Sequence, residues 1–186
     1  MNKVLRSVLS LSLLSFALGF SGCAKEEGSS SAASSTSAPA VQGDSSIVFS
    51  GPADISYPDA TARLFKPNQV WYLVIRGSEG MKNYVAATLA LKPGFFPEVG
   101  SYAVEGFPGI DRPDIFGTIE YAEDREKSAQ TGMAFSEETN GTIVFDSVGD
   151  SISGTYEFSS KDESGATATV SGAFKVDRPA DYAPAP

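Results

Sequence analysis

The side chains able to do covalent chemistry in this chain are few, and the most distinctive is the thiol of Cys23. The sequence contains one cysteine and no histidine. Histidine is the commonest general base and the commonest ligand for transition metals. Its absence excludes Ser–His and Cys–His nucleophile pairs and zinc sites of the His/Cys kind. We therefore expect a protein that is not an enzyme, with no catalytic residues, no metal and no cofactor.

Acidic side chains are numerous, but their spacing indicates no particular chemistry. Glu120, Glu123, Asp124 and Glu126 lie close together in the sequence. Calcium prefers clustered carboxylate and carbonyl oxygens, yet this run does not match the calcium-binding loop of about 12 residues. No two acids have a spacing that would mark the carboxylate pair of a glycosidase. We interpret the run as a solvated loop.

Aromatic residues in loop-like contexts are the best candidates for a binding site. Phe95 and Phe96 precede a proline, and Phe107 lies between a glycine and a proline. Aromatic rings exposed on loops mark binding sites for apolar ligands, sugars or proteins. We therefore predict that Phe95, Phe96 and Phe107 are ligand-binding residues.

The N-terminus has the pattern of an export signal. Lys3 and Arg6 give it a basic start, and the apolar run 8–18 follows. A helix that spans a bilayer needs about 20 apolar residues, so this run is too short to be one. A basic start followed by a short apolar run is typical of a signal peptide, which we place at residues 1–22.

The end of that segment, Phe20-Ser21-Gly22-Cys23, resembles the lipobox of bacterial lipoproteins, with Phe20 where leucine is usual. The resemblance implies that the Cys23 sulfur receives diacylglycerol, that the chain is cut before it and that the new amine is acylated. Two or three acyl chains suffice for stable anchoring, so the implied location is the cell envelope. Ala24 replaces the aspartate of the inner-membrane retention signal, which favours the outer membrane in a host that has one.

Residues 23–45 are rich in serine and alanine, and we expect the lipidated cysteine and a disordered tether there. About 20 such residues span roughly 25 Å. Loss of residues 1–22 removes Lys3 and Arg6 and no acid, which takes the net charge from −9 to −11. That charge disfavours direct adhesion to anionic headgroups, and we expect no nucleic-acid partner because it also repels phosphate backbones. The expected membrane contact is therefore the lipid on Cys23.

From residue 46 to 178 the sequence alternates between apolar and polar residues, with turn signals between short runs. The clearest runs are 152–159 and 166–176. Such alternation is typical of antiparallel strands with one buried face. We predict one all-β domain over 46–178, either an antiparallel β-sandwich or a closed β-barrel of about 8–10 short strands.

Three details refine this prediction. The run Val70–Ile75 is apolar on both faces, which predicts the most buried strand. Gly117, Gly154 and Gly172 interrupt strand-like runs, and glycine inside a strand marks a bend or a close approach of another backbone. Residues 179–186 are rich in proline and alanine, and we expect a disordered tail there.

A second resemblance concerns the end of the chain. The segment Ile152–Phe158, together with Gly172-Ala173-Phe174, resembles the closing strands of uncharacterised β-rich bacterial lipoproteins. That resemblance supports the β fold and implies no chemistry, because those families share no agreed activity.

These observations favour a membrane-anchored lipoprotein that acts as a non-enzymatic binding or envelope-interaction module, with an envelope protein or a small apolar ligand as its partner. Two alternatives are open at this stage: a lipocalin-like barrel that carries a small apolar ligand inside it, and an envelope hydrolase. An exposed aromatic patch would favour the first reading and a ligand-sized interior cavity the second. Activity lost on changing a single acid would favour the third.

Overall fold

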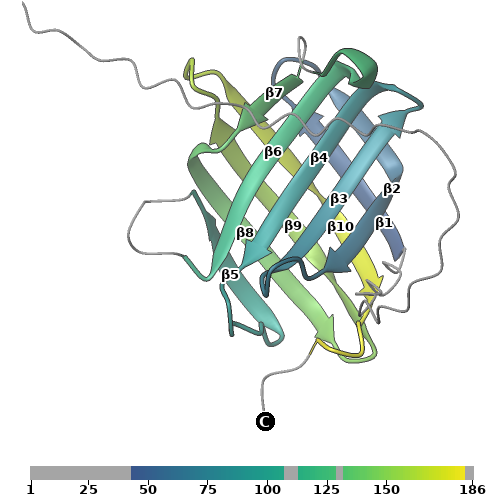
Figure 1. Cartoon of the computed structure of the whole chain (residues 1–186), viewed down its shortest axis with the longest axis vertical. Helices are drawn as coiled ribbons and strands as arrows, with labels where there is room; N and C mark the ends of the chain where they lie inside the picture. The colour runs from purple at the N-terminus through teal and green to yellow at the C-terminus, as the bar shows by residue number, and fades with distance from the viewer. Residues whose placement is uncertain (1–42, 107–112, 129–131, 183–186) are drawn as a thin grey trace, which may run out of the picture. The chain divides into compact units, whose positions relative to one another are not determined.

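A computed structural model of the chain describes residues 43–106, 113–128 and 132–182 (Figure 1). Cys23, the signal segment and most of the predicted tether lie outside these residues. The described part is built from strands, which confirms the all-β prediction, and includes one short 3₁₀ turn, η1 (Arg125–Lys127). The strands are β1 (Gly43–Ser50), β2 (Ile55–Phe65), β3 (Trp71–Glu79), β4 (Lys82–Leu91), β5 (Gly100–Glu105), β6 (Ile115–Asp124), β7 (Gly132–Phe135), β8 (Glu137–Val148), β9 (Ser151–Lys161) and β10 (Thr167–Asp177).

The strands form one sheet that closes on itself. Neighbours follow the order β4-β3-β2-β1-β10-β9-β8-β5-β6-β7, and β4 also pairs with β6. This additional pairing, nine residue pairs long, joins the two sides of the sheet into a barrel-like ring (Figure 1). The described pairings are antiparallel except for the one between β5 and β6, which is parallel. Closure removes the exposed edge that β4 would present in an open sheet, whereas β7, at the end of the strand order, pairs only with β6 in the described residues.

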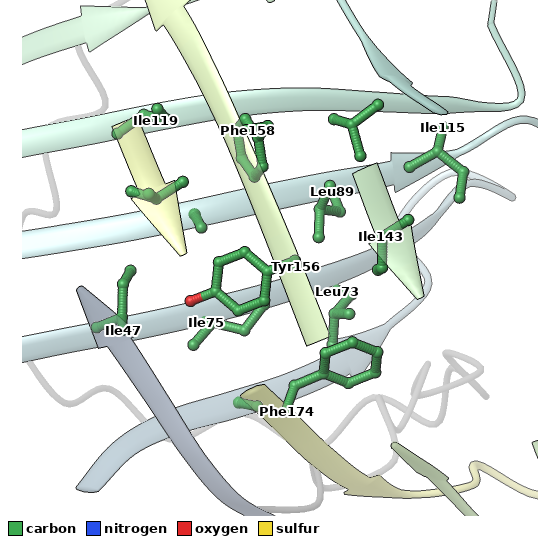
Figure 2. Packing of buried hydrophobic residues seen from close by; sticks show 14 of the residues in the cluster. Ile47, Leu73, Ile75, Leu89, Ile115, Ile119, Ile143, Tyr156, Phe158 and Phe174 are labelled. Atoms are coloured by element: carbon green, nitrogen blue, oxygen red, sulfur yellow. The ribbon is translucent and has the colours of Figure 1, made fainter. Parts of the chain in front are cut away.

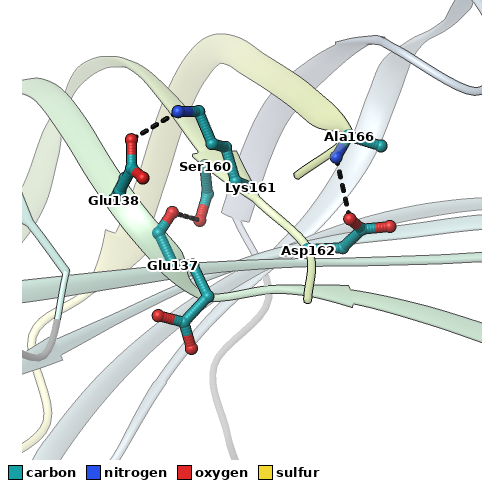
Figure 3. Close-up of polar contacts among 6 residues, drawn as sticks. All are labelled: Glu137, Glu138, Ser160, Lys161, Asp162 and Ala166. Carbon is teal, nitrogen blue, oxygen red and sulfur yellow. Dashed lines mark hydrogen bonds and ion pairs between the residues drawn. The ribbon is translucent and has the colours of Figure 1, made fainter. Parts of the chain in front are cut away.

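Alternation along each strand decides which side chains point into the ring. In β9 and β10 the even-numbered residues predicted to share one face point inward, and Ile152, Tyr156, Phe158, Val170 and Phe174 are buried. The hairpin between these strands is fastened by Asp162, whose carboxylate accepts hydrogen bonds from the backbone N–H groups of Ser164 and Ala166, both at 2.9 Å (Figure 3). These bonds, led by the one from the Ser164 hydroxyl, hold the pKa of Asp162 below its usual value.

Side chains fill the interior of the ring. Figure 2 shows Phe158, Tyr156 and Phe174 among isoleucines and leucines from the surrounding strands. A Cβ added to Gly117 would lie 2.5 Å from a methyl carbon of Val104, and one added to Gly154 would lie 3.0 Å from the Phe174 ring. Both glycines are thus places where another group approaches closely, as their positions in the sequence predict.

The first strand is joined to its neighbours partly through side chains. The register of β1 against β2 shifts between Ser45 and Ile47, which is the mark of a β-bulge. Next to this bulge, Ser45 Oγ accepts the backbone N–H of Lys175 at 3.2 Å and Ser46 Oγ accepts that of Ala173 at 3.1 Å. The serine hydroxyls therefore replace carbonyl acceptors that the bulge displaces from β10.

Candidate functional site

Two of the three aromatic residues predicted to bind a ligand lie at one end of the barrel. Phe95 and Phe96 are in the connection from β4 to β5, half-buried, and packed against the core. The Phe95 ring meets Tyr102 edge to face at 5.5 Å, and the Phe96 ring meets Tyr182 in the same way at 5.2 Å. Phe107 lies outside the described residues. Ligand binding by the three phenylalanines stays a prediction, and the contacts of Phe95 and Phe96 give them a packing role.

Tyr182 closes the same end of the barrel. Its side chain is 3 % exposed, and its ring lies 4.9 Å from Trp71 in an edge-to-face arrangement. The Arg178 side chain donates to the Tyr182 carbonyl at 2.9 Å, and its guanidinium lies 5.8 Å from the centre of the ring. The expectation of a loose tail from residue 179 is therefore wrong for residues 179–182, because the tyrosine buries its ring on the core. Residues 183–186 lie outside the description.

Buried aromatic side chains close this end of the barrel. Burial raises the pKa of Tyr182 to about 12, as expected for a phenol that has lost contact with water. Trp71 beneath it is 5 % exposed, and its indole N–H has no hydrogen-bond partner among the described atoms. Lys66 Nζ lies over the Trp71 ring, 5.3 Å from its centre. The aromatic contacts at this end thus stabilise the barrel.

A hollow lies where the ring is most weakly closed. β5 pairs with β8 along its whole length but with β6 only at Glu105 and Phe116, whereas β7 pairs with β6 from Ile119 to Ala122. Beside this seam lies an open groove of about 550 Å³. It is lined by residues 103–106 of β5 and the following loop, and by residues 136–140 at the start of β8. We call it the seam groove.

A buried polar network forms the floor of the seam groove. Thr139 is 6 % exposed and Ser160 is 1 % exposed. The Thr139 hydroxyl donates to the Gly117 carbonyl at 3.1 Å and lies 2.8 Å from the Ser160 hydroxyl. Ser160 in turn donates to the Glu137 carbonyl at 3.1 Å (Figure 3). Thr139 therefore satisfies a carbonyl of β6 at the level where neither β5 nor β7 pairs with it.

The rim of the seam groove is acidic. Glu105 and Glu137 are exposed, and Glu138 forms an ion pair with Lys161 (Figure 3). Glu138 adopts a left-handed backbone conformation with φ of 46°, which is uncommon for a residue with a side chain and belongs to the irregular start of β8. The Gly106 N–H donates to the Thr139 carbonyl at 3.1 Å and ties the two rims together. This geometry suits a polar or cationic group better than an anion.

The acidic run that could have suggested calcium is spread over different structures. Glu120 and Asp124 belong to β6, and Glu126 to the 3₁₀ turn η1, where Asp124 accepts the Glu126 N–H at 3.0 Å as its N-cap. In the described ranges, no group of three or more acidic, cysteine or histidine side chains could hold a metal ion. The same part of the chain contains no helix long and apolar enough to cross a membrane.

Sequence reasoning missed Tyr182, Thr139 and Ser160. Ser160 left a signal, because it continues the inward series of Ile152, Tyr156 and Phe158 and puts a hydroxyl where an apolar side chain is expected. Tyr182 is surrounded in sequence by prolines and alanines, which concealed its burial. Comparison with known proteins adds no further site: no family model, curated protein or solved structure matches the chain.

Proposed function

We propose that this protein is a lipid-anchored lipoprotein of the cell envelope whose barrel is a non-enzymatic binding module that engages its partner on its outer surface. The anchor is proposed on the lipobox-like Phe20-Ser21-Gly22-Cys23. The observation that carries the binding role is the seam groove, which combines an open volume of about 550 Å³ with a hydrogen-bonded floor.

The packed interior supports an outer rather than an inner binding surface. Phe49, Phe158 and Phe174 are each at most 2 % exposed, and aromatic rings approach the inward glycines closely. Lipocalin-like carriers enclose their ligand in the interior of the barrel. We therefore place the partner of this protein at the seam groove and not along the barrel axis.

Charge supports a partner with cationic groups. Glu105 and Glu137 line the seam groove, and neither forms an ion pair within the described residues. Glu138, in contrast, pairs with Lys161. A protein of net charge −9 in the full chain also attracts cationic partners from a distance. A basic segment of another envelope protein fits both the shape and the sign of this groove.

Photo-crosslinking in native cells tests the binding role. A photoreactive residue at Asn140, on the rim of the seam groove, is expected to capture a partner, and the same residue at Thr155, exposed on the outer face of β9, is not. The charge reversals Glu105→Lys and Glu137→Lys are expected to reduce capture, whereas Glu163→Lys in the β9–β10 hairpin leaves it unchanged. Equal capture at Asn140 and Thr155, or capture indifferent to the reversals, would overturn this assignment.

The anchor is tested separately. Metabolic palmitate labelling is expected to mark the mature protein, and Cys23→Ser is expected to release it from the membrane fraction. The anchor would be refuted if the mature protein carries no palmitate label and the Cys23→Ser variant stays in the membrane fraction. The crosslinking result does not depend on this outcome.

A further inference from the structure

One part of the barrel's outer wall is apolar where the outside of a β-barrel in water is normally polar. Pairing across four strands aligns Phe65 of β2 with Tyr72 of β3, Tyr72 with Ala90 of β4, and Ala90 with Phe116 of β6. These four side chains point outward, because the residues beside them in each strand are buried in the core. Phe65 is 38 % exposed and its ring stacks on Tyr72 at 5.9 Å.

A shallow hollow continues this row towards the end of the barrel. It has a volume of about 170 Å³ and is lined by Val70, Tyr72, Ala90, Pro93, Pro113 and Phe116, with Lys92 at its edge. We call the hollow together with Phe65 the outer aromatic patch. It explains the run Val70–Ile75, which is apolar on both faces: only Trp71, Leu73 and Ile75 are buried, and the alternate side chains belong to the outer wall. The run predicted to be the most buried strand is therefore buried on one face, and its other face belongs to the outer wall.

The outer aromatic patch lies at the end of the barrel where the N-terminal segment enters. Gly43, the first residue of β1, pairs with Ala62, three residues before Phe65 in β2. Cys23 is 20 residues before Gly43, and the tether expected there from the sequence has a span of roughly 25 Å. The opposite end is a further length of β2 away, and that strand of 11 residues measures about 35 Å. A bilayer that holds Cys23 is therefore within reach of this end of the wall.

Cations flank the patch in a chain that is acidic overall. Lys66 and Lys92 are exposed beside it, and Arg63 and Arg76 lie on the outer face of the same wall. The acids nearby are Asp114, which forms an ion pair with Lys92 at 3.6 Å, and Glu105, which is paired with Phe116 across the seam. Long basic side chains around an aromatic surface suit the boundary between headgroups and acyl chains, where the stems stay apolar and the charges stay wet.

We propose that the outer aromatic patch rests on the surface of the bilayer in which the lipid on Cys23 is anchored, so that the barrel lies against the membrane on its β2–β3–β4–β6 wall instead of turning freely at the end of a tether. This inference rests on the proposed anchor. The contact is apolar first, because the net negative charge of the chain opposes attraction to anionic headgroups.

The test supplies the anchor chemically, so that it does not depend on lipidation in cells. The chain from Cys23 onward is coupled through its only thiol to maleimide-bearing lipid in phosphatidylcholine vesicles, and lysine acylation is read by mass spectrometry. Lys66 and Lys92 are expected to react severalfold more slowly on vesicles than in the uncoupled chain. Lys82 at the far end of β4 and Lys175 on the outer face of β10 serve as controls whose rates stay the same.

Matched variants decide what causes the protection. Phe65→Ser is expected to abolish it, whereas Val48→Ser, which removes an apolar side chain of β1 that is 46 % exposed, is expected to leave it intact. Phe65 is exposed, so both variants should keep the urea midpoint of the parent. Rates at Lys66 and Lys92 that do not change on vesicles would overturn the proposal. Protection that appears without vesicles as the chain is concentrated would also overturn it, because it would assign the patch to contact with a second copy of the chain. Protection that comes from a bound protein and not from lipid would overturn it as well.

The two proposals fail separately. A chain that shows vesicle protection but no palmitate label in cells retains the membrane-facing wall and loses the natural anchor. A chain that is labelled with palmitate but shows no protection retains the anchor and loses the membrane-facing wall.

Discussion

The hydroxyl of Tyr156 donates a hydrogen bond to the main-chain carbonyl of Ser46, 3.1 Å away, across the strand that separates the two residues. Between them lies Gly172 of β10, where a Cβ would be 3.0 Å from the tyrosine oxygen and 2.1 Å from the Ser46 carbonyl oxygen. Burial raises the pKa of Tyr156 above its usual value, so the hydroxyl keeps its proton throughout the neutral range. The bulge in β1, the glycine in β10 and the tyrosine in β9 therefore form one joint inside the barrel.

Removing the hydroxyl tests this joint. Tyr156→Phe leaves the ring in place and deprives the Ser46 carbonyl of its donor, so the free energy of unfolding is expected to fall by about 1–2 kcal/mol. Urea denaturation followed by the fluorescence of Trp71 measures the change. Tyr72→Phe, on the outer wall, is the control and is expected to fall within about 0.5 kcal/mol of the parent. Equal effects of the two substitutions would show that the bond contributes nothing.

Adding a methyl group to Gly172 tests the same joint by crowding. Gly172→Ala places a carbon against a main-chain oxygen that cannot swing away, and overpacking of this kind costs about 1–3 kcal/mol or more. Gly149→Ala is the matched control, because the nearest atom to its new carbon is a serine hydroxyl at 4.0 Å. Thermal unfolding of both variants should show a lower midpoint for Gly172→Ala alone. A midpoint for Gly172→Ala equal to that of the control would contradict the close approach.

The polar floor of the seam groove is expected to act as a unit. Thr139→Val leaves the Gly117 carbonyl without its donor, and Ser160→Ala leaves the Glu137 carbonyl without its own, so each should lower the free energy of unfolding by about 1–3 kcal/mol. Because the two hydroxyls are 2.8 Å apart, the double variant should lose less than the sum of the single losses. A double-mutant cycle in urea measures this coupling, and strictly additive losses would rule out a shared network.

Alkaline pH is expected to weaken the closed end of the barrel. Burial raises the pKa of Tyr182 from its ordinary value of 10.0 to about 12, so the folded state holds this proton more tightly than the unfolded chain does. The contribution to stability is complete below about pH 10 and is lost as the pH rises to about 12. Tyr182→Phe should therefore lose less stability than the parent between about pH 10 and about pH 12 in urea titrations. An identical decline in both proteins would show that other groups cause it.

Much of the fold was predictable because the alternation of the C-terminal strands is clear. In Ser151–Lys161 and Thr167–Asp177 the inward series contains Ile152, Phe158 and Phe174, and the hairpin signal at Asp162 and Gly165 is local. The choice between a sandwich and a barrel was not predictable. It depends on the pairing of β4 with β6, and a pairing between distant strands leaves no mark in either segment alone.

The candidate site was less accessible to sequence reasoning. The seam groove exists because β5 and β7 share one edge of β6, which is a property of the assembled ring. Phe95 and Phe96 were identified by their loop-like setting, yet the contact of Phe96 with Tyr182 depends on a residue that is far away in sequence and in a segment without alternation. Of the floor residues, only Ser160 was indicated by the sequence, because its hydroxyl occurs in an otherwise apolar inward series.

The attachment of β1 has a mechanical consequence. Any pull transmitted from residues before Gly43 reaches the barrel along the axis of a strand that is held on both flanks, by pairs with β2 and by bonds to β10 that include those of Ser45 and Ser46. Such a load shears these bonds together and does not unzip them one after another. The domain is thus built to withstand tension from its N-terminal side, and a force applied instead across β1 should peel the strand away far more easily.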